Sequence, residues 1–257
     1  MFSRTAAELK KGLVILVLMI CAVFPNIVCA EDNLLTHAET YYQAGQYQRA
    51  VETYEQGLSQ YPGNVTLLYN LGNSYYRMGE IGRAVYYFKK AQRLSPRDAD
   101  IRVNLASAKE KVVDKVSKTS GIGPPLNWDW LVSWVSFNEA VAGLLVILIL
   151  FNSLLLLYVI KKRGELFRNV FFSVFGVLII YLIFFGMYYQ TMFHVKHGII
   201  ISTKIEAKSE PSSTVKTLFY LHEGVECRVL KQIGQWDNIE LKNGLSGWVK
   251  SNDLMVL

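Results

Sequence analysis

Apolar and polar residues are spaced in different ways along the chain, and the changes divide it into four parts. A short apolar run ends before residue 25, and apolar positions at helical spacing follow as far as residue 116. Residues 140–160 and 169–189 are long runs without charge, each close to the roughly 20 residues that cross a bilayer. From residue 197 onward, short alternating runs favour strands. We therefore expect a multidomain membrane protein with a helical domain, a two-helix transmembrane hairpin and a small C-terminal β-barrel.

Two stretches of the helical part repeat each other. Gly45 and Gly79 are 34 positions apart, and so are Pro62 and Pro96. A fixed period of 34 residues is the length of one helix–turn–helix unit of the tetratricopeptide repeat, which both copies resemble. Such repeats need a capping helix, because each unit leaves its neighbour-facing side uncovered. The expected boundaries are residues 31–116 for the whole domain, 31–64 and 65–98 for the two repeats, and 99–116 for the capping helix.

The resemblance to tetratricopeptide repeats implies a groove that binds a peptide or a partner helix. Leu35 and Glu39 stand where some members of the family use Lys and Asn to hold a C-terminal carboxylate, so we do not expect that mode of binding. In an alternative interpretation the tyrosines only pack between helices and Arg77 is solvated. The groove positions that the resemblance implies are Glu39, Tyr42, Tyr69, Asn73, Tyr76 and Arg77.

The N-terminus has the pattern of an export signal. Basic residues precede a short apolar run, and small residues follow it. Val28 and Ala30 occupy the positions that define a cleavage site, so we expect residues 1–30 to be removed between Ala30 and Glu31. An uncleaved membrane anchor is one alternative. A lipoprotein formed through Cys29 is less favoured, because the residue before it is bulky.

The loop between the two long apolar runs predicts how the hairpin is oriented. Residues 161–168 contain four Lys and Arg residues against one Glu, and short loops of this kind stay in the cytoplasm. The helical domain and the C-terminus would then both lie outside the cytoplasm, at the inner membrane of a bacterium. Residues 117–139 are expected to form a linker and an interfacial aromatic segment, or alternatively a small aromatic core. The runs contain no Asp, Glu, Lys, Arg or His, which argues against transport.

The C-terminal part resembles the bacterial SH3-like family over residues 197–257. An Asn-Gly turn and short strands indicate a small barrel. Lys208 replaces an Arg of a common family motif, and Ser209 or Glu210 replaces its Gly, which puts any ligand contact of that motif in doubt. Exported modules of this family often bind cell-wall peptides, and the resemblance implies such a surface at Tyr220 and Trp236. The landmarks that carry the resemblance are Gly224, Trp236, Gly244, Gly247, Trp248 and Val249.

The sequence contains no pattern of a known catalytic or cofactor site. A phosphate-binding loop and a nucleophile motif are both missing. His194 and His197 are a weak metal-ligand pair, and after cleavage Cys227 would be the single cysteine, which we expect to be buried. The net charge of +6 gathers beside the apolar runs, so it indicates membrane topology rather than nucleic-acid binding. We expect no enzymatic activity, no cofactor, no metal and no nucleic-acid partner.

The order of the parts as a whole resembles the BatE-type proteins of the Bacteroides aerotolerance (Bat) operons. The resemblance implies an inner-membrane scaffold that works with membrane-anchored von Willebrand A-domain proteins and with a MoxR-type ATPase across the membrane. It also implies a link to aerotolerance or envelope stress. Two alternatives stay open, a peptidoglycan-binding sensor that acts through the SH3-like part and, less favoured, a metal-dependent envelope enzyme.

Overall fold

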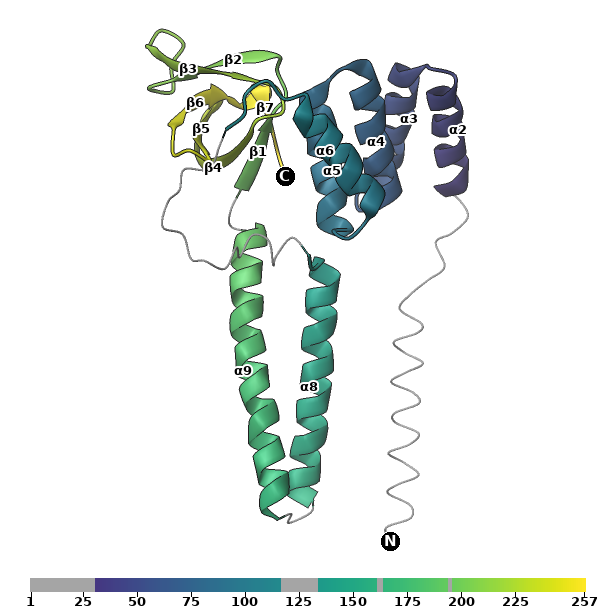
Figure 1. The fold of residues 1–257 in the computed structure, drawn as a ribbon, viewed down its shortest axis with the longest axis vertical. Helices are drawn as coiled ribbons and strands as arrows, with labels where there is room; N and C mark the ends of the chain where they lie inside the picture. Colours follow the sequence, from purple (N-terminus) through teal and green to yellow (C-terminus); the bar gives the residue numbers. More distant parts are fainter. Residues whose placement is uncertain (1–30, 117–133, 161–163, 194–195) are drawn as a thin grey trace.

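The computed structural model describes residues 31–116, 134–160, 164–193 and 196–257. Five helices and a β-sheet form a head, and two long helices extend from one end of this head (Figure 1). The predicted leader and most of the predicted linker lie outside the described residues. The helices of the head are α2 (Glu31–Gln43), α3 (Tyr47–Gln60), α4 (Val65–Met78), α5 (Ile81–Leu94) and α6 (Ala99–Glu110).

The ends of these helices follow from local sequence. The side chain of Asn64 caps α4 by accepting a hydrogen bond from the backbone N–H of Leu67 at 2.9 Å. Gly79 ends the same helix with a φ of 83°, a left-handed conformation that favours glycine. Asp98 caps α6, which ends at Glu110, whereas the capping helix was expected to continue to residue 116.

The repeat helices pack at close range because small residues face large ones. A Cβ atom added at Gly72 would lie 2.6 Å from the ring of Phe88, so α4 and α5 approach each other at a distance that only glycine permits. The Phe88 side chain is only 1% exposed at this contact. On the other side of the pair, α6 buries Ile101, Leu105 and Ala108 and covers the second repeat.

The C-terminal part forms one antiparallel sheet with the strand order β3-β2-β6-β5-β4-β1-β7. In this order β3 and β7 are unpaired edges, so the sheet is not the closed barrel that was expected. An Asn243-Gly244 turn joins β5 to β6, and Gly244 has a φ of 84°. The strands are β1 (Lys196–Ile200), β2 (Lys204–Lys208), β3 (Thr217–His222), β4 (Glu226–Ile233), β5 (Trp236–Leu241), β6 (Ser246–Lys250) and β7 (Leu254–Val256).

The repeat helices and the sheet share one hydrophobic core. Strand β1 packs against α5, and its residues Ile199 and Ile200 are both fully buried. Because neighbouring residues of a strand point to opposite faces, the sheet is covered on both sides at this strand. No local pattern in the sequence indicates this contact, which joins into one body two parts that were expected to be separate modules.

Two long helices, α8 (Phe137–Ile160) and α9 (Glu165–Phe193), lie side by side below the head (Figure 1). Both are long and apolar enough to cross a membrane, and only 6% of each candidate span is buried. The core helix of a soluble protein would be buried instead, so this exposure favours a lipid environment. The helices extend beyond the predicted runs, and residues 165–168 of the predicted loop belong to α9.

Two hydrogen bonds join α9 of the hairpin to the segment at the start of α8, near the head. Tyr181 donates a hydrogen bond to the carbonyl of Ala140 at 2.8 Å, and Tyr188 donates one to the carbonyl of Val135 at 3.0 Å. Ser136 and Glu139 form a capping box at the start of α8, in which each residue accepts from the backbone N–H of the other. These contacts hold the start of α8 and the C-terminal half of α9 together at the end of the hairpin next to the head.

An ion pair joins the hairpin to the repeat helices. Arg97, in the turn between α5 and α6, pairs with Glu139 at the beginning of α8. The sheet follows α9 in the chain and lies at the same end of the hairpin as the repeat helices (Figure 1). The repeat helices and the sheet therefore lie at one end of the two apolar helices.

Candidate protein-binding surfaces

The predicted groove residues Tyr69 and Asn73 lie together on α4, where they face α6. Asn104 of α6 donates hydrogen bonds to the Tyr69 hydroxyl at 2.9 Å and to the side-chain oxygen of Asn73 at 2.8 Å. Both predicted residues are half-buried, so part of each side chain serves the contact between the helices. Asn104 had not been singled out in the sequence, although its place at the middle of the capping helix was a usable signal.

Arg77 and Tyr42 meet through a third residue, Tyr47. The Arg77 guanidinium lies over the Tyr47 ring at 5.2 Å from its centroid, and the rings of Tyr42 and Tyr47 are 5.3 Å apart, edge to face. Burial raises the pKa of Tyr42, and the positive charge of Arg77 partly opposes this effect. The second repeat thus places a cation beside two aromatic rings of the first repeat.

Tyr76 receives a second cation from the end of α6. The ammonium of Lys111 lies 4.0 Å from the centroid of the Tyr76 ring. Glu39 is exposed on α2, and its negative charge helps to raise the pKa of Tyr54, although burial is the larger cause. These residues form a surface over α2, the start of α3, α4 and the end of α6. We call it the tyrosine surface, and it consists of Glu39, Tyr42, Tyr47, Tyr69, Asn73, Tyr76, Arg77 and Lys111.

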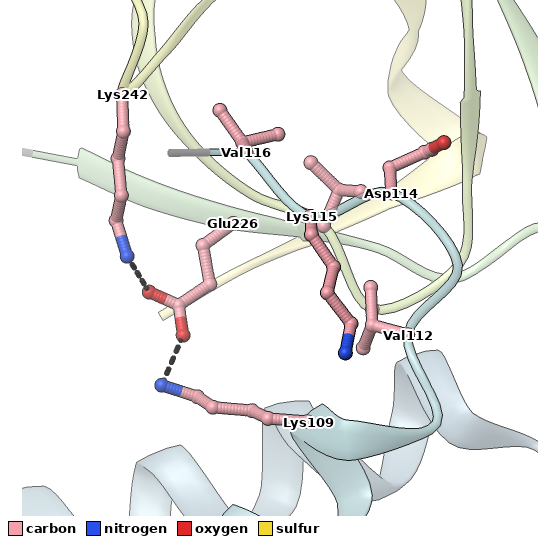
Figure 2. Close-up of a pocket in the computed structure, with 9 residues that line it drawn as sticks. Lys109, Val112, Asp114, Lys115, Val116, Glu226 and Lys242 are labelled. Carbon is pink, nitrogen blue, oxygen red and sulfur yellow. Dashed lines mark hydrogen bonds and ion pairs between the residues drawn. The ribbon is translucent and has the colours of Figure 1, made fainter. Parts of the chain in front are cut away.

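A cluster of lysines surrounds Glu226 where the repeat helices meet the sheet (Figure 2). The carboxylate of Glu226 contacts the ammonium groups of Lys109 at 2.7 Å, Lys242 at 2.8 Å and Lys89 at 3.2 Å. Burial alone would raise the pKa of Glu226, but the three positive charges outweigh it and hold that pKa well below its usual range. Burial also lowers the pKa of Lys89 to about 8, although Glu226 opposes that shift.

An open pocket of about 190 Å³ lies beside this cluster. It forms between β4 and the segment that follows α6 (Figure 2). The side chain of Val112 fills the space next to Gly224, where an added Cβ atom would lie 2.4 Å from it. On the far side of the pocket Asp114 accepts a hydrogen bond from the backbone N–H of His222 at 2.6 Å and also contacts its ring. The segment after α6 is thereby fixed against the sheet. The lining residues are Lys109, Val112, Asp114, Lys115, Val116, Gly224, Val225, Glu226 and Lys242.

The predicted cell-wall surface lies on the outer face of the sheet. Trp236 alternates along β5 with the buried Asp237 and is half-buried on the opposite face. Tyr220 is 52% exposed, with the Lys204 ammonium 4.6 Å from its ring centroid. Strands β2 and β6 separate these two aromatic residues, and Trp248 of β6 lies on the face between them. Tyr220 and Trp236 therefore do not form the two walls of one narrow groove.

Other predicted residues lie apart from these surfaces. Ala30 lies outside the described residues, and Glu31 is the first residue of α2. His194 also lies outside them, while His197 belongs to β1 and has its pKa lowered, mainly by burial. No group of three or more metal-ligating side chains occurs within the described parts of the chain. Cys227 is buried, which raises the pKa of its thiol to about 12.

Comparison with known proteins identifies the helical part of the head. No curated protein matches the chain. Residues 35–99 match the family model of the tetratricopeptide repeat. This range contains most of α2 and all of α3, α4 and α5. The helices that carry most of the tyrosine surface are therefore tetratricopeptide repeats.

Proposed function

We propose that the chain is a membrane-anchored scaffold that binds a partner protein through its tyrosine surface. The observation that carries the proposal is the placement of Arg77 and Lys111 over the rings of Tyr47 and Tyr76, on helices of a repeat type that generally mediates protein–protein contacts. Half-buried tyrosines held by such contacts present rigid apolar area and polar edges, which is the composition of an energetically important interface. The scaffold has no catalytic role of its own.

The head lies outside the cytoplasm in this proposal. The support comes from the short cationic loop at the far end of the hairpin, which favours a cytoplasmic position for that end. Because the repeat helices and the sheet both lie at the opposite end, they share one compartment. The export signal expected in residues 1–30 leads to the same orientation.

The finer proposal is a scaffold of the Bat type, with a C-terminal sheet of SH3-like type. It rests on the order of an export signal, two repeats, an apolar hairpin and a small β-rich part. The partners would be membrane-anchored von Willebrand A-domain proteins, and the process would be aerotolerance or the response to envelope stress.

Crosslinking in intact cells tests the partner-binding role. A chain with Tyr76→Ala and Arg77→Ala should lose crosslinked membrane-protein partners that the unsubstituted chain retains. The matched control is Tyr61→Ala with Arg228→Ala, which removes a half-buried tyrosine and an exposed arginine that belong to neither proposed binding surface. Equal crosslinking by both variants would exclude the tyrosine surface as the binding site.

A cell-wall sensor is the second candidate function. The observation that favours it is the row of aromatic side chains on the outer face of the sheet, where Trp236, Trp248 and Tyr220 lie on the same side. The sheet shares its core with the repeats, so the full chain is the correct sample for a test. It should sediment with purified wall sacculi, and Trp236→Ala should abolish sedimentation. A chain that stays in the supernatant at low salt would exclude this function.

A further inference from the structure

The pocket between α6 and β4 has more positive charge than its carboxylates neutralise. Glu226 is shared by Lys89, Lys109 and Lys242. Lys115 adds a fourth ammonium, and no ion pair of its side chain occurs among the described residues. The second carboxylate, Asp114, is occupied by the backbone N–H and the ring of His222. A local excess of about two to three positive charges follows.

The ammonium groups of Lys109, Lys115 and Lys242 line the same pocket. Lys242 contacts one oxygen of Glu226 and Lys109 contacts the other, so Glu226 holds the two ammonium groups on opposite sides of its carboxylate (Figure 2). Each ammonium has three N–H donors, and its contact with Glu226 occupies only one of them. Lys115 extends toward the same space from the segment after α6 (Figure 2). The pocket therefore presents several free donors to an anion.

The walls of the pocket indicate which anion would fit. Val112, Val116 and Val225 line it next to the lysines. Apolar side chains next to the lysines suit a ligand that carries an aliphatic stem beside its charged group. A carboxylate on a short aliphatic side chain has this character, whereas a phosphate group is polar on all sides. The pocket matches the side chain of Glu or Asp in a partner.

The pocket and the tyrosine surface both border the end of α6. Lys109 contacts Glu226 in the pocket, and Lys111, two residues later, covers the ring of Tyr76. We propose that the pocket binds an acidic side chain of the same partner segment that the tyrosine surface holds. This inference rests on the proposed partner-binding function and adds a chemical requirement, namely an acidic residue at one end of the bound segment.

A direct binding measurement tests the pocket without knowledge of the partner. The probe is a fluorescent hexaglutamate peptide with an amidated C-terminus, titrated with the full chain in detergent micelles and followed by anisotropy. Lys115→Gln with Lys242→Gln should weaken binding by about tenfold or more, because two charge-assisted contacts are removed. The control pair, Lys216→Gln with Lys250→Gln, removes the same charge from exposed positions and should change affinity less than twofold.

The outcomes separate the possibilities. Equal affinity of the two double variants for the peptide, or no saturable binding to the unsubstituted chain, would contradict the proposal that the pocket binds an acidic side chain. Tighter binding of a peptide with phosphoserine at all six positions overturns the choice of a carboxylate. If the pocket double variant does not fold, Lys115→Gln alone decides, since Lys115 is exposed and its substitution leaves the contacts of Glu226 intact.

The failure of this inference is distinguishable from failure of the proposed function. In the cellular crosslinking experiment, one outcome is that Tyr76→Ala with Arg77→Ala loses partners while Lys115→Gln with Lys242→Gln retains them. That outcome contradicts only the proposed role of the pocket. Retention with both variants overturns the partner-binding function itself. Loss with both variants, together with weaker peptide binding, supports both.

Discussion

The backbone N–H of Gly82 donates a hydrogen bond of 2.8 Å to the carboxylate of Glu223, although the two residues are 141 positions apart in the chain. Gly82 lies in the first turn of α5, where backbone N–H groups lack partners within the helix and attract negative charge. Glu223 comes directly after strand β3. A side chain of the sheet thus serves the N-terminal end of a repeat helix, and this contact fixes the sheet against the array.

Substitution of Gly82 should separate the two parts of the head. A Cβ atom there would lie 2.4 Å from the carbonyl oxygen of Ile200, a backbone atom that cannot rotate away. Gly82→Ala should therefore lower the free energy of unfolding by about 2 kcal/mol or more and expose the sheet to protease.

The matched control for this change is Gly63→Ala, where an added Cβ meets nothing within 4 Å. The measurements are urea unfolding followed by circular dichroism and the rate of limited proteolysis. Equal stability of the two variants would contradict the interlocked arrangement of repeats and sheet.

The parts of the fold that were predictable depend on contacts between neighbours in sequence. Gly79 ends α4, and Gly72 faces Phe88 within one repeat. Both features could therefore be predicted from the 34-residue repeat. The contact between Gly82 and Ile200 joins segments with different periodicity, and no local sequence pattern predicts it. The closed barrel was expected because short strands and tight turns do not reveal whether the two edge strands meet.

The lysine cluster predicts how stability depends on pH. Glu226 keeps a pKa well below its usual range in the folded state, whereas in the unfolded chain it titrates near pH ~4.3. As the pH falls, the unfolded chain takes up the proton first. The contribution of Glu226 is therefore complete above about pH 5 and declines progressively at lower pH.

Glu226→Gln isolates this contribution. At pH 7 the variant should lose about 2 kcal/mol, because three ammonium groups lose their shared partner. The difference from the unsubstituted chain should shrink between about pH 5 and pH 3. Glu110→Gln, at the exposed end of α6, is the control and should show little difference at any pH. A difference that stays constant over this range would contradict the assigned charge contacts.

The ion pair between Arg97 and Glu139 should contribute little by itself. Its side chains are 60% and 41% exposed, and exposed pairs contribute about 0.2–1 kcal/mol. A double-mutant cycle with Arg97→Gln and Glu139→Gln should give a coupling energy in this range, falling as salt increases. Glu139→Gln alone should cost more than Arg97→Gln, since Glu139 also caps α8 through Ser136. Equal costs would contradict the capping role.

The tyrosine surface shows how far a site can be predicted from repeated positions. The resemblance to tetratricopeptide repeats implied Tyr69, Asn73, Tyr76 and Arg77, and all four belong to α4. Their partners Tyr47, Asn104 and Lys111 come from other helices. Which side chain crosses from one helix to the next depends on packing distances, and a single repeat does not encode them.

The orientation of the head can be measured with fusions at the C-terminus. Leu257 follows strand β7, and its backbone N–H donates to the carbonyl of His197 at 2.8 Å, so a flexible linker should precede the reporter. Alkaline phosphatase fused there should be active, and a fluorescent protein that folds only in the cytoplasm should be dark. The opposite pair of results would place the repeats and the sheet in the cytoplasm and exclude both a wall sensor and an exported scaffold.

The cysteines provide a count that reports on the leader. The thiol of Cys227 has a pKa of about 12 because it is buried, and its hydrogen donates to the carbonyl of Gly198 at 3.5 Å. At pH 8 the thiolate, which is the reactive form, is a negligible fraction, so a thiol reagent should not label Cys227 in the native protein. In denaturant, one labelled thiol per chain indicates cleavage between Ala30 and Glu31. Three labelled thiols indicate that Cys21 and Cys29 remain and that the leader is a retained anchor. Rapid labelling of the cleaved native chain would contradict the buried position of Cys227 in the sheet.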